Sequence, residues 1–289
     1  MVPIRTGRLV VKVDMLVEHT DVPKGMTYRQ AARKAVAMCV SDFAAKGVRP
    51  DSFVASIGLK NGVSEEQVDA LASGFRDAEG EWGVLLVGGD TNEAKELVID
   101  CAMVGFAKRL VSRRGARPGD ILVVTGPFGY PPAGLRILEG SAAATTEFGK
   151  KARASVLNPT PSLGVGMALA PFLTSAMDSS DGLARSLHTL AAESRVGFEV
   201  TELPAARGVR GFAEANGLGA EELVLQGGEE YLVVGTVPKR RIANARVSVR
   251  RAGGVLLGIG EAIPEPGHIV LNTGGIRRPI RDSGWTHLR

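Results

Sequence analysis

The chain has 289 residues, 44% of them hydrophobic and 23% charged, which is enough for two medium domains with buried cores and excludes an intrinsically disordered protein. Its 37 glycines follow no period, which excludes a collagen-like or low-complexity array. The formal net charge is +4 with acids and bases interspersed, and no apolar run approaches the roughly 18 residues of a membrane span, so we expect neither a nucleic-acid nor a membrane partner.

The chain begins with a predicted strand and helix that each carry an aspartate in an apolar setting. Residues 9–17 predict the strand, which is mostly apolar but contains Asp14. A helix is expected from a Thr27 cap to about Ala45, with Gly47 as its end. Asp42 interrupts this helix at the edge of the face expected to be buried. Neither aspartate occupies a natural capping position.

The rest of the first half alternates strands with a helix. Residues 53–59 predict a second strand, and Ser64 opens the next helix with a capping box. Residues 84–87 are a continuous apolar run, typical of a strand buried on both faces, and Gly88-Gly89-Asp90-Thr91 is expected to end it in a turn. Residues 97–107 predict a further strand. This order of elements indicates an α/β or α+β first domain.

The two cysteines, Cys39 and Cys101, lie on expected core faces and form no metal-spaced pair. The first apolar stretch carries Lys12 and Asp14, which is not typical of a signal peptide. We therefore expect reduced thiols in a cytoplasmic protein.

Residues 113–120 are rich in glycine, proline and arginine and predict a boundary between a domain of residues 1–112 and a domain of residues 113–289. The second domain is expected to mix strands and helices. Strands are expected at residues 121–125, 175–177, 198–200, 232–237 and 255–263, and helices from about 133, at 163–172, at 183–194 and at 221–225.

Several aspartates lie in or just after elements that otherwise need apolar residues. They are Asp14, Asp42, Asp90, Asp178 and Asp181. Carboxylates at scattered positions suit Mg²⁺, which proteins commonly hold through a few acids together with substrate phosphates. The alternative for a lone aspartate is a cap or turn, and Asp181, which precedes Gly182 and a helix, fits a helix N-cap. Taken jointly, the five favour a metal–phosphate site with several ions.

Other chemistries find no support in the sequence. It contains no G-x-x-x-x-G-K-[ST] loop and no H-E-x-x-H motif, and its four histidines show no ligand spacing. An acceptor that is itself a phosphate is already ionised near neutral pH and needs no histidine base. Alignment and charge neutralisation by Mg²⁺ then carry the reaction, and an acid-rich site without a histidine base fits this class of phosphoryl transfer.

Six short motifs occur in order along the chain. They are Val-Asp-Met-Leu-Val (13–17), Val-Ser-Asp-Phe-Ala-Ala-Lys-Gly (40–47), Val-Gly-Gly-Asp-Thr (87–91), Arg-Gly-Ala-Arg-Pro-Gly-Asp (114–120), Asp-Ser-Ser-Asp-Gly-Leu (178–183) and Gly-Gly-Glu-Glu-Tyr (227–231). Together they resemble the thiamine-monophosphate kinase family of the aminoimidazole-ribonucleotide-synthetase-like superfamily, over essentially the whole chain. The resemblance implies a two-domain α/β (α+β) fold, with an N-terminal mixed-sheet domain that dimerises and a C-terminal α/β domain.

The resemblance also implies an activity and a set of site residues. The activity is the transfer of phosphate from ATP to thiamine monophosphate, with several Mg²⁺ ions, in a homodimer whose N-terminal sheets pair. The implied metal ligands are Asp14, Asp42, Asp90, Asp178 and Asp181, the ATP contacts Gly89, Asp90, Arg113 and Ser180, and the thiamine contacts Glu229 and Trp285. For Trp285 the alternative is a C-terminal packing anchor.

The sequence departs from the family pattern in three places. The family carries a glycine-rich segment ending in paired aspartates before the first strand, and we expect the natural coding sequence to begin upstream of Met1. Asp21 stands where the family has a substrate-binding histidine, with His19 two residues earlier. The family's Glu-Asp-Tyr-Glu has become Glu229-Glu230-Tyr231-Leu232, so no role is assigned to Glu230.

Rival interpretations come from the same superfamily and from outside enzymology. The hydrogenase-maturation relative ends in a cysteine, whereas this chain ends His287-Leu288-Arg289. The selenophosphate synthetase relative has a reactive N-terminal cysteine or selenocysteine, and the purine-synthesis relatives have Gly-Gly-Glu-Thr in place of Gly-Gly-Asp-Thr. A catalytically silent nucleotide-binding dimer is the alternative from another class.

Overall fold

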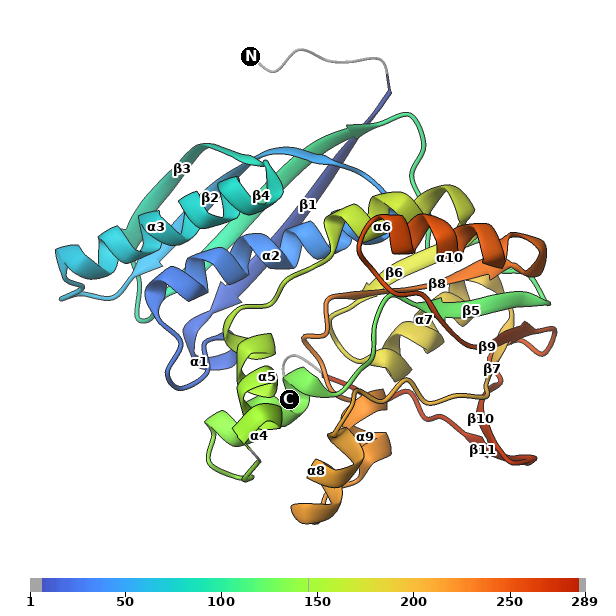
Figure 1. The fold of residues 1–289 in the computed structure, drawn as a ribbon. Coiled ribbons are helices and arrows are strands. Elements are labelled where there is room, and N and C mark those ends of the chain that lie inside the picture. The colour runs from blue at the N-terminus through green and yellow to red at the C-terminus, as the bar shows by residue number, and fades with distance from the viewer. Residues whose placement is uncertain (1–6, 145, 286–289) are drawn as a thin grey trace.

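In the computed structural model, which describes residues 7–144 and 146–285, the N-terminal part forms a mixed sheet with the strand order β1-β4-β2-β3. Strands β1 and β2 pair antiparallel with β4, and β2 pairs parallel with β3. Two long helices, α2 and α3, cover one face of this sheet (Figure 1). The elements are β1 (Arg8–Val17), α1 (Glu18–Asp21), α2 (Tyr28–Lys46), β2 (Pro50–Leu59), α3 (Glu65–Trp82), β3 (Leu85–Glu93) and β4 (Val98–Ala107).

Local sequence signals decide where the two covering helices begin and end. Thr27 and Ser64 each open a helix with a capping box, which was predicted at Ser64, whereas Thr27 was predicted only as a cap. In this motif the cap side chain accepts the backbone N–H of the third helical residue, and the side chain of that residue accepts the backbone N–H of the cap. Gly47 and Gly83 end them in the left-handed conformation, both at φ 64°, which a residue without a Cβ adopts without strain. The expected Thr27 cap and Gly47 stop are confirmed.

Strand β1 has two faces of different character. Its even-numbered residues, among them Leu16, point toward α2 and α3, and Leu16 is fully buried. Its odd-numbered residues point away from the helices, onto what we call the outer face of the sheet. Exposed apolar side chains on β1 at this face are Leu9, Val11, Val13 and Met15, each more than half exposed. Exposed apolar patches of this kind are typical of interaction surfaces.

Strand β3 differs from its sequence prediction. The apolar run was expected to be buried on both faces, but all nine residues of β3 are exposed, with Leu85 at 61% and Val87 at 60%. The strand also continues through Asp90 to Glu93 instead of ending at the glycines. The cause is its position at the edge of the sheet, where β2 is its hydrogen-bonded neighbour among the described strands. An apolar run indicates that water is excluded, but it does not say by what.

The C-terminal part is built on a seven-stranded sheet with the order β11-β10-β7-β9-β5-β8-β6. Its two faces are both covered, because α4, α5, α7, α8 and α9 share one hydrophobic core with β5, while α6 and α10 share another (Figure 1). The strands are β5 (Asp120–Val124), β6 (Ser175–Ser179), β7 (Gly197–Val200), β8 (Leu232–Pro238), β9 (Leu257–Ile263), β10 (Ile269–Thr273) and β11 (Ile276–Pro279). The helices are α4 (Tyr130–Leu138), α5 (Thr146–Leu157), α6 (Leu163–Leu169), η1 (Ala170–Phe172), α7 (Leu183–Ser194), α8 (Val209–Ala215), α9 (Ala220–Leu225), η2 (Lys239–Arg241) and α10 (Ile242–Arg251). Of these, α5, α8, η2, α10, β10 and β11 were not predicted.

Helix α2 connects the two parts. Near its end, Ala44 and Ala45 leave the N-terminal core and pack in one buried cluster with Val123 of β5 and Leu169 of α6. Gly166 lets α6 approach this closely, because a Cβ at that position would lie 2.3 Å from the carbonyl oxygen of Ala44. The end of α2 that carries Asp42 is therefore fixed against the C-terminal sheet.

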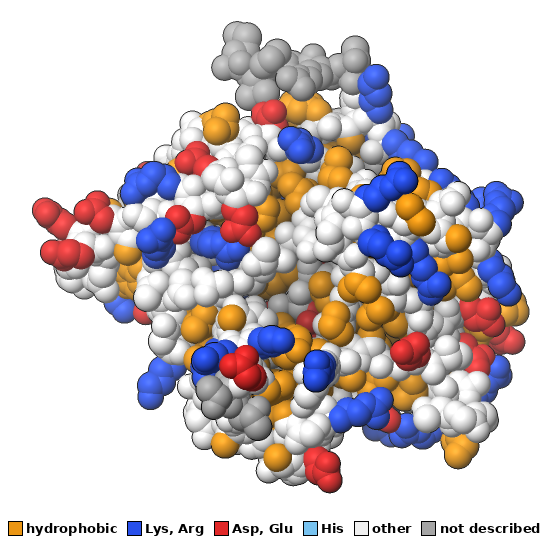
Figure 2. Space-filling model, viewed as in Figure 1, with side chains coloured by type: hydrophobic (Ala, Val, Ile, Leu, Met, Phe, Trp, Pro, Cys, Tyr) orange, Lys and Arg blue, Asp and Glu red, His pale blue; other side chains and the backbone are white. Residues whose placement is uncertain are grey.

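No helix among the described residues is long and apolar enough to cross a membrane. On the face of the molecule shown in Figure 2, Lys and Arg side chains are interspersed with acidic and apolar ones. The C-terminal residues His287-Leu288-Arg289 lie outside the described part of the chain.

Candidate active site

Three aspartates that are far apart in the sequence meet between the two sheets. Asp14 comes from β1, Asp42 from α2 and Asp178 from β6. The ammonium of Lys12 joins the first two, because its Nζ lies 3.0 Å from Asp14 Oδ1 and 2.7 Å from Asp42 Oδ2. We call Asp14, Asp42 and Asp178 the acid cluster.

Each member of the acid cluster is held by its own element. Asp14 is an even-numbered residue of β1 and so points toward α2. Asp178 lies within β6, where its Oδ2 accepts a hydrogen bond of 2.9 Å from the hydroxyl of Ser41, the residue before Asp42. One turn further along α2, Lys46 donates to the carbonyl oxygen of Ala176 at 2.7 Å. Two side chains of α2 therefore fix the position of β6.

The acid cluster carries more negative charge than its surroundings neutralise. Burial raises the pKa of Asp178 to about 7, the charges of Asp42 and Asp14 add to this, and the Ser41 hydrogen bond and the charge of Lys12 offset part of the shift. Burial also raises the pKa of Asp14, although Lys12 offsets part of the effect. Burial would lower the pKa of Lys12, but the two carboxylates raise it well above its ordinary value. Such a site attracts cations.

The chemistry of these donors fits Mg²⁺. Among residues 7–144 and 146–285, no three acidic, histidine or cysteine side chains are arranged so that they could hold a metal ion by themselves. Mg²⁺ does not need one, because it usually keeps several waters and binds one or two carboxylates together with substrate phosphates. Asp14 and Asp42, which share a single cation position that Lys12 now fills, supply such a pair.

Positive charge lies on the C-terminal side of the cluster. Burial lowers the pKa of Lys46 to about 8, and the nearby charge of Arg113 lowers it further. Arg113, an expected ATP contact, is exposed on the segment between the two sheets. Two basic side chains, Lys46 and Arg113, therefore lie beside the acid cluster, where a phosphate group would find positive charge.

The expected residues Asp181 and Ser180 lie in the loop that follows β6. The capping alternative for Asp181 is wrong, because the N-cap of α7 is Gly182 and no side chain caps this helix. The loop is tied by its backbone to two distant segments: Asp181 O accepts the Trp285 N–H at 3.1 Å, and Ser180 O accepts the Glu229 N–H at 2.6 Å. Three expected site segments therefore meet next to Asp178.

Glu229 is held by a buried lysine that sequence reasoning missed. Lys34 of α2 is completely buried, and its Nζ donates to the carbonyl oxygen of Asp21 at 2.8 Å and to Glu229 Oε1. The backbone of Glu229 is left-handed, with φ 63°. Its other oxygen, Oε2, is buried and has no hydrogen-bond partner among the described residues. A signal for Lys34 exists in the sequence, since it stands among the alanines of the apolar stripe.

The neighbouring Glu230 lies in a different environment. Burial raises the pKa of its carboxyl to about 8, and the hydrogen bond from the Gly129 N–H offsets only part of the shift. This bond ties the loop before β8 to the start of α4.

Asp90 and Gly89 are not brought into the acid cluster within one chain. Asp14 is in register with Cys101 of β4, which faces Ala55 of β2, which faces Gly89 of β3. Three strand spacings amount to about 14 Å. A Cβ at Gly89 would lie 2.2 Å from the Ala55 carbonyl oxygen, so the sheet itself requires this glycine.

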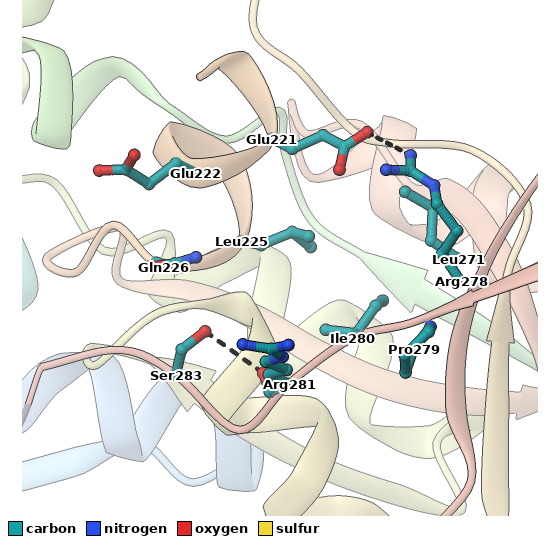
Figure 3. A pocket seen from close by; sticks show the side chains of 10 residues that line it. All are labelled: Glu221, Glu222, Leu225, Gln226, Leu271, Arg278, Pro279, Ile280, Arg281 and Ser283. Carbon is teal, nitrogen blue, oxygen red and sulfur yellow. Dashed lines mark hydrogen bonds and ion pairs between the residues drawn. The ribbon is translucent and has the colours of Figure 1, made fainter. Parts of the chain in front are cut away.

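A pocket of about 190 Å³ lies elsewhere, between α9 and the segment after β11 (Figure 3). Glu221 faces Arg278 across it in an ion pair of 2.6 Å. None of the expected site residues lines it. Its mixed, paired charges give it no evident ligand.

Comparisons with known proteins agree with this architecture. Residues 2–107 match the family model "AIR synthase related protein, N-terminal domain", and residues 117–271 match the corresponding C-terminal domain. Thiamine-monophosphate kinase from Nitrosopumilus maritimus is 37% identical over 281 residues, covering 97% of this chain and 89% of the relative. The enzyme of the same name from Pyrococcus horikoshii is 35% identical over 284 residues, covering 97% and 86%.

Solved structures give the same result. The structure described as "AaThiL complexed with AMPPCP and TMP" superposes with a TM-score of 0.87 at 26% identity, covering 99% of this chain and 89% of that one. Thermus thermophilus tt0281 gives 0.84 at 31% identity, covering 94% and 86%. The hydrogenase maturation protein HypE, at 21% identity and 0.77, shares the fold.

Proposed function

The chain belongs to the thiamine-monophosphate kinase family, and from that premise we propose that it transfers the terminal phosphoryl group of ATP to thiamine monophosphate, giving thiamine diphosphate and ADP. The observation that carries the proposal is the convergence of Asp14, Asp42 and Asp178 between the two sheets. The relative bound to AMPPCP and TMP has the same fold over 99% of this chain.

In this proposal the acid cluster holds Mg²⁺ through Asp14, Asp42 and Asp178, with Asp181 next to it on the loop after β6. The bound Mg²⁺ supplies neutralising charge for the phosphates. The chain's own residues position the reactants. Lys46 and Arg113 stand where they can meet phosphate oxygens, and no side chain has to act as a base because the acceptor phosphate is already ionised.

The thiamine end is assigned to the segments tied to the loop after β6. Glu229 Oε2 has no partner among the described residues, so a carboxylate oxygen remains for a cationic ring. Trp285 is 51% exposed, and its backbone bond to Asp181 keeps it beside this loop. An indole at that position can stack on an aromatic ring of the substrate.

A homodimer follows from the outer face and from the edge strand β3. The apolar side chains of β1 and of β3 need a cover, and an unpaired edge invites a strand of a second copy. If β3 of one copy lies beside β1 of another, Asp90 reaches the partner's acid cluster across the interface. This accounts for a ligand that lies about 14 Å from Asp14 in its own chain. We assign residues 1–112 to the dimerising domain, residues 113–289 to the second domain, and the enzyme to the cytoplasm.

The test is ADP release in a coupled assay with ATP, Mg²⁺ and thiamine monophosphate. Turnover that depends on all three components supports the kinase. Nucleotide binding without turnover would contradict it and leave a silent nucleotide-binding dimer.

The position of Asp90 can be tested by subunit mixing. Asp90→Asn and Asp42→Asn chains are each expected to be inactive alone. If Asp90 acts in the partner's site, random mixing restores one intact site in half of the dimers, or about a quarter of the wild-type activity. No recovery would place both residues in one chain's site.

A further inference from the structure

Lys12 differs from the other two lysines near the site in how it is held. Lys34 is completely buried, and Lys46 is anchored to the Ala176 carbonyl oxygen. Lys12 is bound only by carboxylates among the described residues: Nζ lies 3.0 Å from Asp14 and 2.7 Å from Asp42. Its side chain keeps 31% of its surface exposed. A four-carbon stem that reaches solvent can move its charge without disturbing the core.

The location of the ammonium is what matters. Lys12 and Asp14 are two residues apart on one face of β1, and the ammonium lies between that strand and α2. The two carboxylates share this one cation, and an acid cluster with Asp178 behind them attracts more positive charge. A divalent ion that binds both Asp14 and Asp42 must therefore take the place of Lys12.

We propose that Lys12 is a built-in, displaceable counter-cation. Without nucleotide it pairs Asp14 with Asp42 and competes with free divalent ions for them. When a nucleoside triphosphate arrives, its phosphates accept the displaced ammonium, and the carboxylates become available to the metal. Metal and nucleotide then bind cooperatively. The competition with free metal stands on the geometry alone, while the nucleotide half rests on the proposed function.

The experiment is a titration with Mn²⁺ alone, followed by electron paramagnetic resonance, which requires no turnover. Lys12→Met should bind free Mn²⁺ about 10-fold more tightly than the wild type, a change of about 1.4 kcal/mol. Lys12→Arg keeps the charge and should bind as weakly as the wild type. Lys60→Met is the matched control, because Lys60 forms an ion pair of 2.9 Å with Glu18 away from the acid cluster. Its Mn²⁺ affinity should not change.

The same titration with AMPPCP present measures the coupling. The nucleotide should tighten Mn²⁺ binding several-fold more in the wild type than in Lys12→Met. Equal Mn²⁺ affinity in the wild type and Lys12→Met, both folded by circular dichroism, would overturn the proposal. If Lys12→Met does not fold, Lys12→Gln takes its place under the same criterion. If Lys12→Met binds Mn²⁺ more tightly than the wild type but the wild type shows no kinase turnover, the result supports the role of Lys12 and rejects the proposed function.

Discussion

The buried ion pair between Lys34 and Glu229 gives the sharpest prediction about stability. It joins α2 of the N-terminal part to the loop before β8, and Lys34 is completely buried. Lys34→Met keeps the length and packing of the side chain but removes its charge. Glu229 Oε1 then loses its ion-pair partner, and Oε2 of the same carboxylate has no hydrogen-bond partner among the described residues. The carbonyl oxygen of Asp21 also loses its hydrogen-bond donor.

The expected cost can be worked out from this geometry. Breaking a buried pair from one side costs about 3–5 kcal/mol, because a carboxylate remains without compensation. The Glu229 side chain keeps 19% of its surface exposed, which places the expectation near the lower end, about 3 kcal/mol. Glu229→Gln leaves the completely buried ammonium with the Asp21 carbonyl and an amide oxygen but without a counter-charge, and should cost about 3–5 kcal/mol. The double variant should cost about 2 kcal/mol less than the sum of the two.

Urea unfolding followed by circular dichroism measures all three variants, with equal m-values as the check for two-state behaviour. Lys60→Met removes an exposed partner of Glu18 and should cost less than about 1 kcal/mol. If Lys34→Met is no more destabilising than Lys60→Met, or if the double variant is strictly additive, the buried pair does not connect the two parts as described.

Three further predictions concern the site and the surfaces. Asp178→Asn should lower turnover with ATP and thiamine monophosphate at least about 100-fold. Its melting temperature should stay close to that of the wild type, because the amide oxygen still accepts a hydrogen bond from the Ser41 hydroxyl. Near-normal turnover would remove Asp178 from the site. Glu230 keeps its proton in the folded state up to its pKa of about 8 but releases it near the ordinary 4.5 when unfolded, so stability should fall as pH rises between these values, by at most about 1.4 kcal/mol per pH unit. Glu230→Gln should lose this part of the slope in urea unfolding at pH 5 to 8.5, and an unchanged slope would be the contrary result. Val13→Asp on the outer face should halve the mass measured by light scattering, whereas Val68→Asp, at an exposed valine of α3, should not; equal masses for the two variants would locate the interface elsewhere.

The sequence predicted what depends on neighbours in the chain. The cap at Thr27, the capping box at Ser64 and the stop at Gly47 are each specified by a few neighbouring residues, and all three are confirmed. Asp14 and Asp42 stood out because an acid in an apolar element needs a reason. Their meeting with Asp178, across two sheets, could be inferred from the family resemblance but not from spacing.

What could not be predicted depends on contacts made by folding. Lys12 looks like an ordinary strand lysine in the sequence, and although Lys34 stands out among the alanines of α2, its partner Glu229 is identified only when α2 and the loop before β8 are brought together. The apolar run of β3 was wrongly placed in the interior, because hydrophobicity alone cannot tell a strand in the core from an exposed strand at the edge of a sheet. The helices α5, α8 and α10 span only 12, 7 and 10 residues, so each offers about two or three turns of pattern from which to predict a helix.

The shared packing of α2 has a consequence for how the protein unfolds. Ala44 and Ala45 belong to the same buried cluster as Val123 and Leu169. Unfolding of the C-terminal sheet would therefore expose the end of α2, and unfolding of α2 would leave a cavity beside that sheet. If either part unfolds, the other therefore loses packing contacts that contribute to its own enthalpy of unfolding. Scanning calorimetry of the protein should therefore show one endotherm, with a calorimetric enthalpy close to the van't Hoff value, although the chain contains two sheets and two family domains.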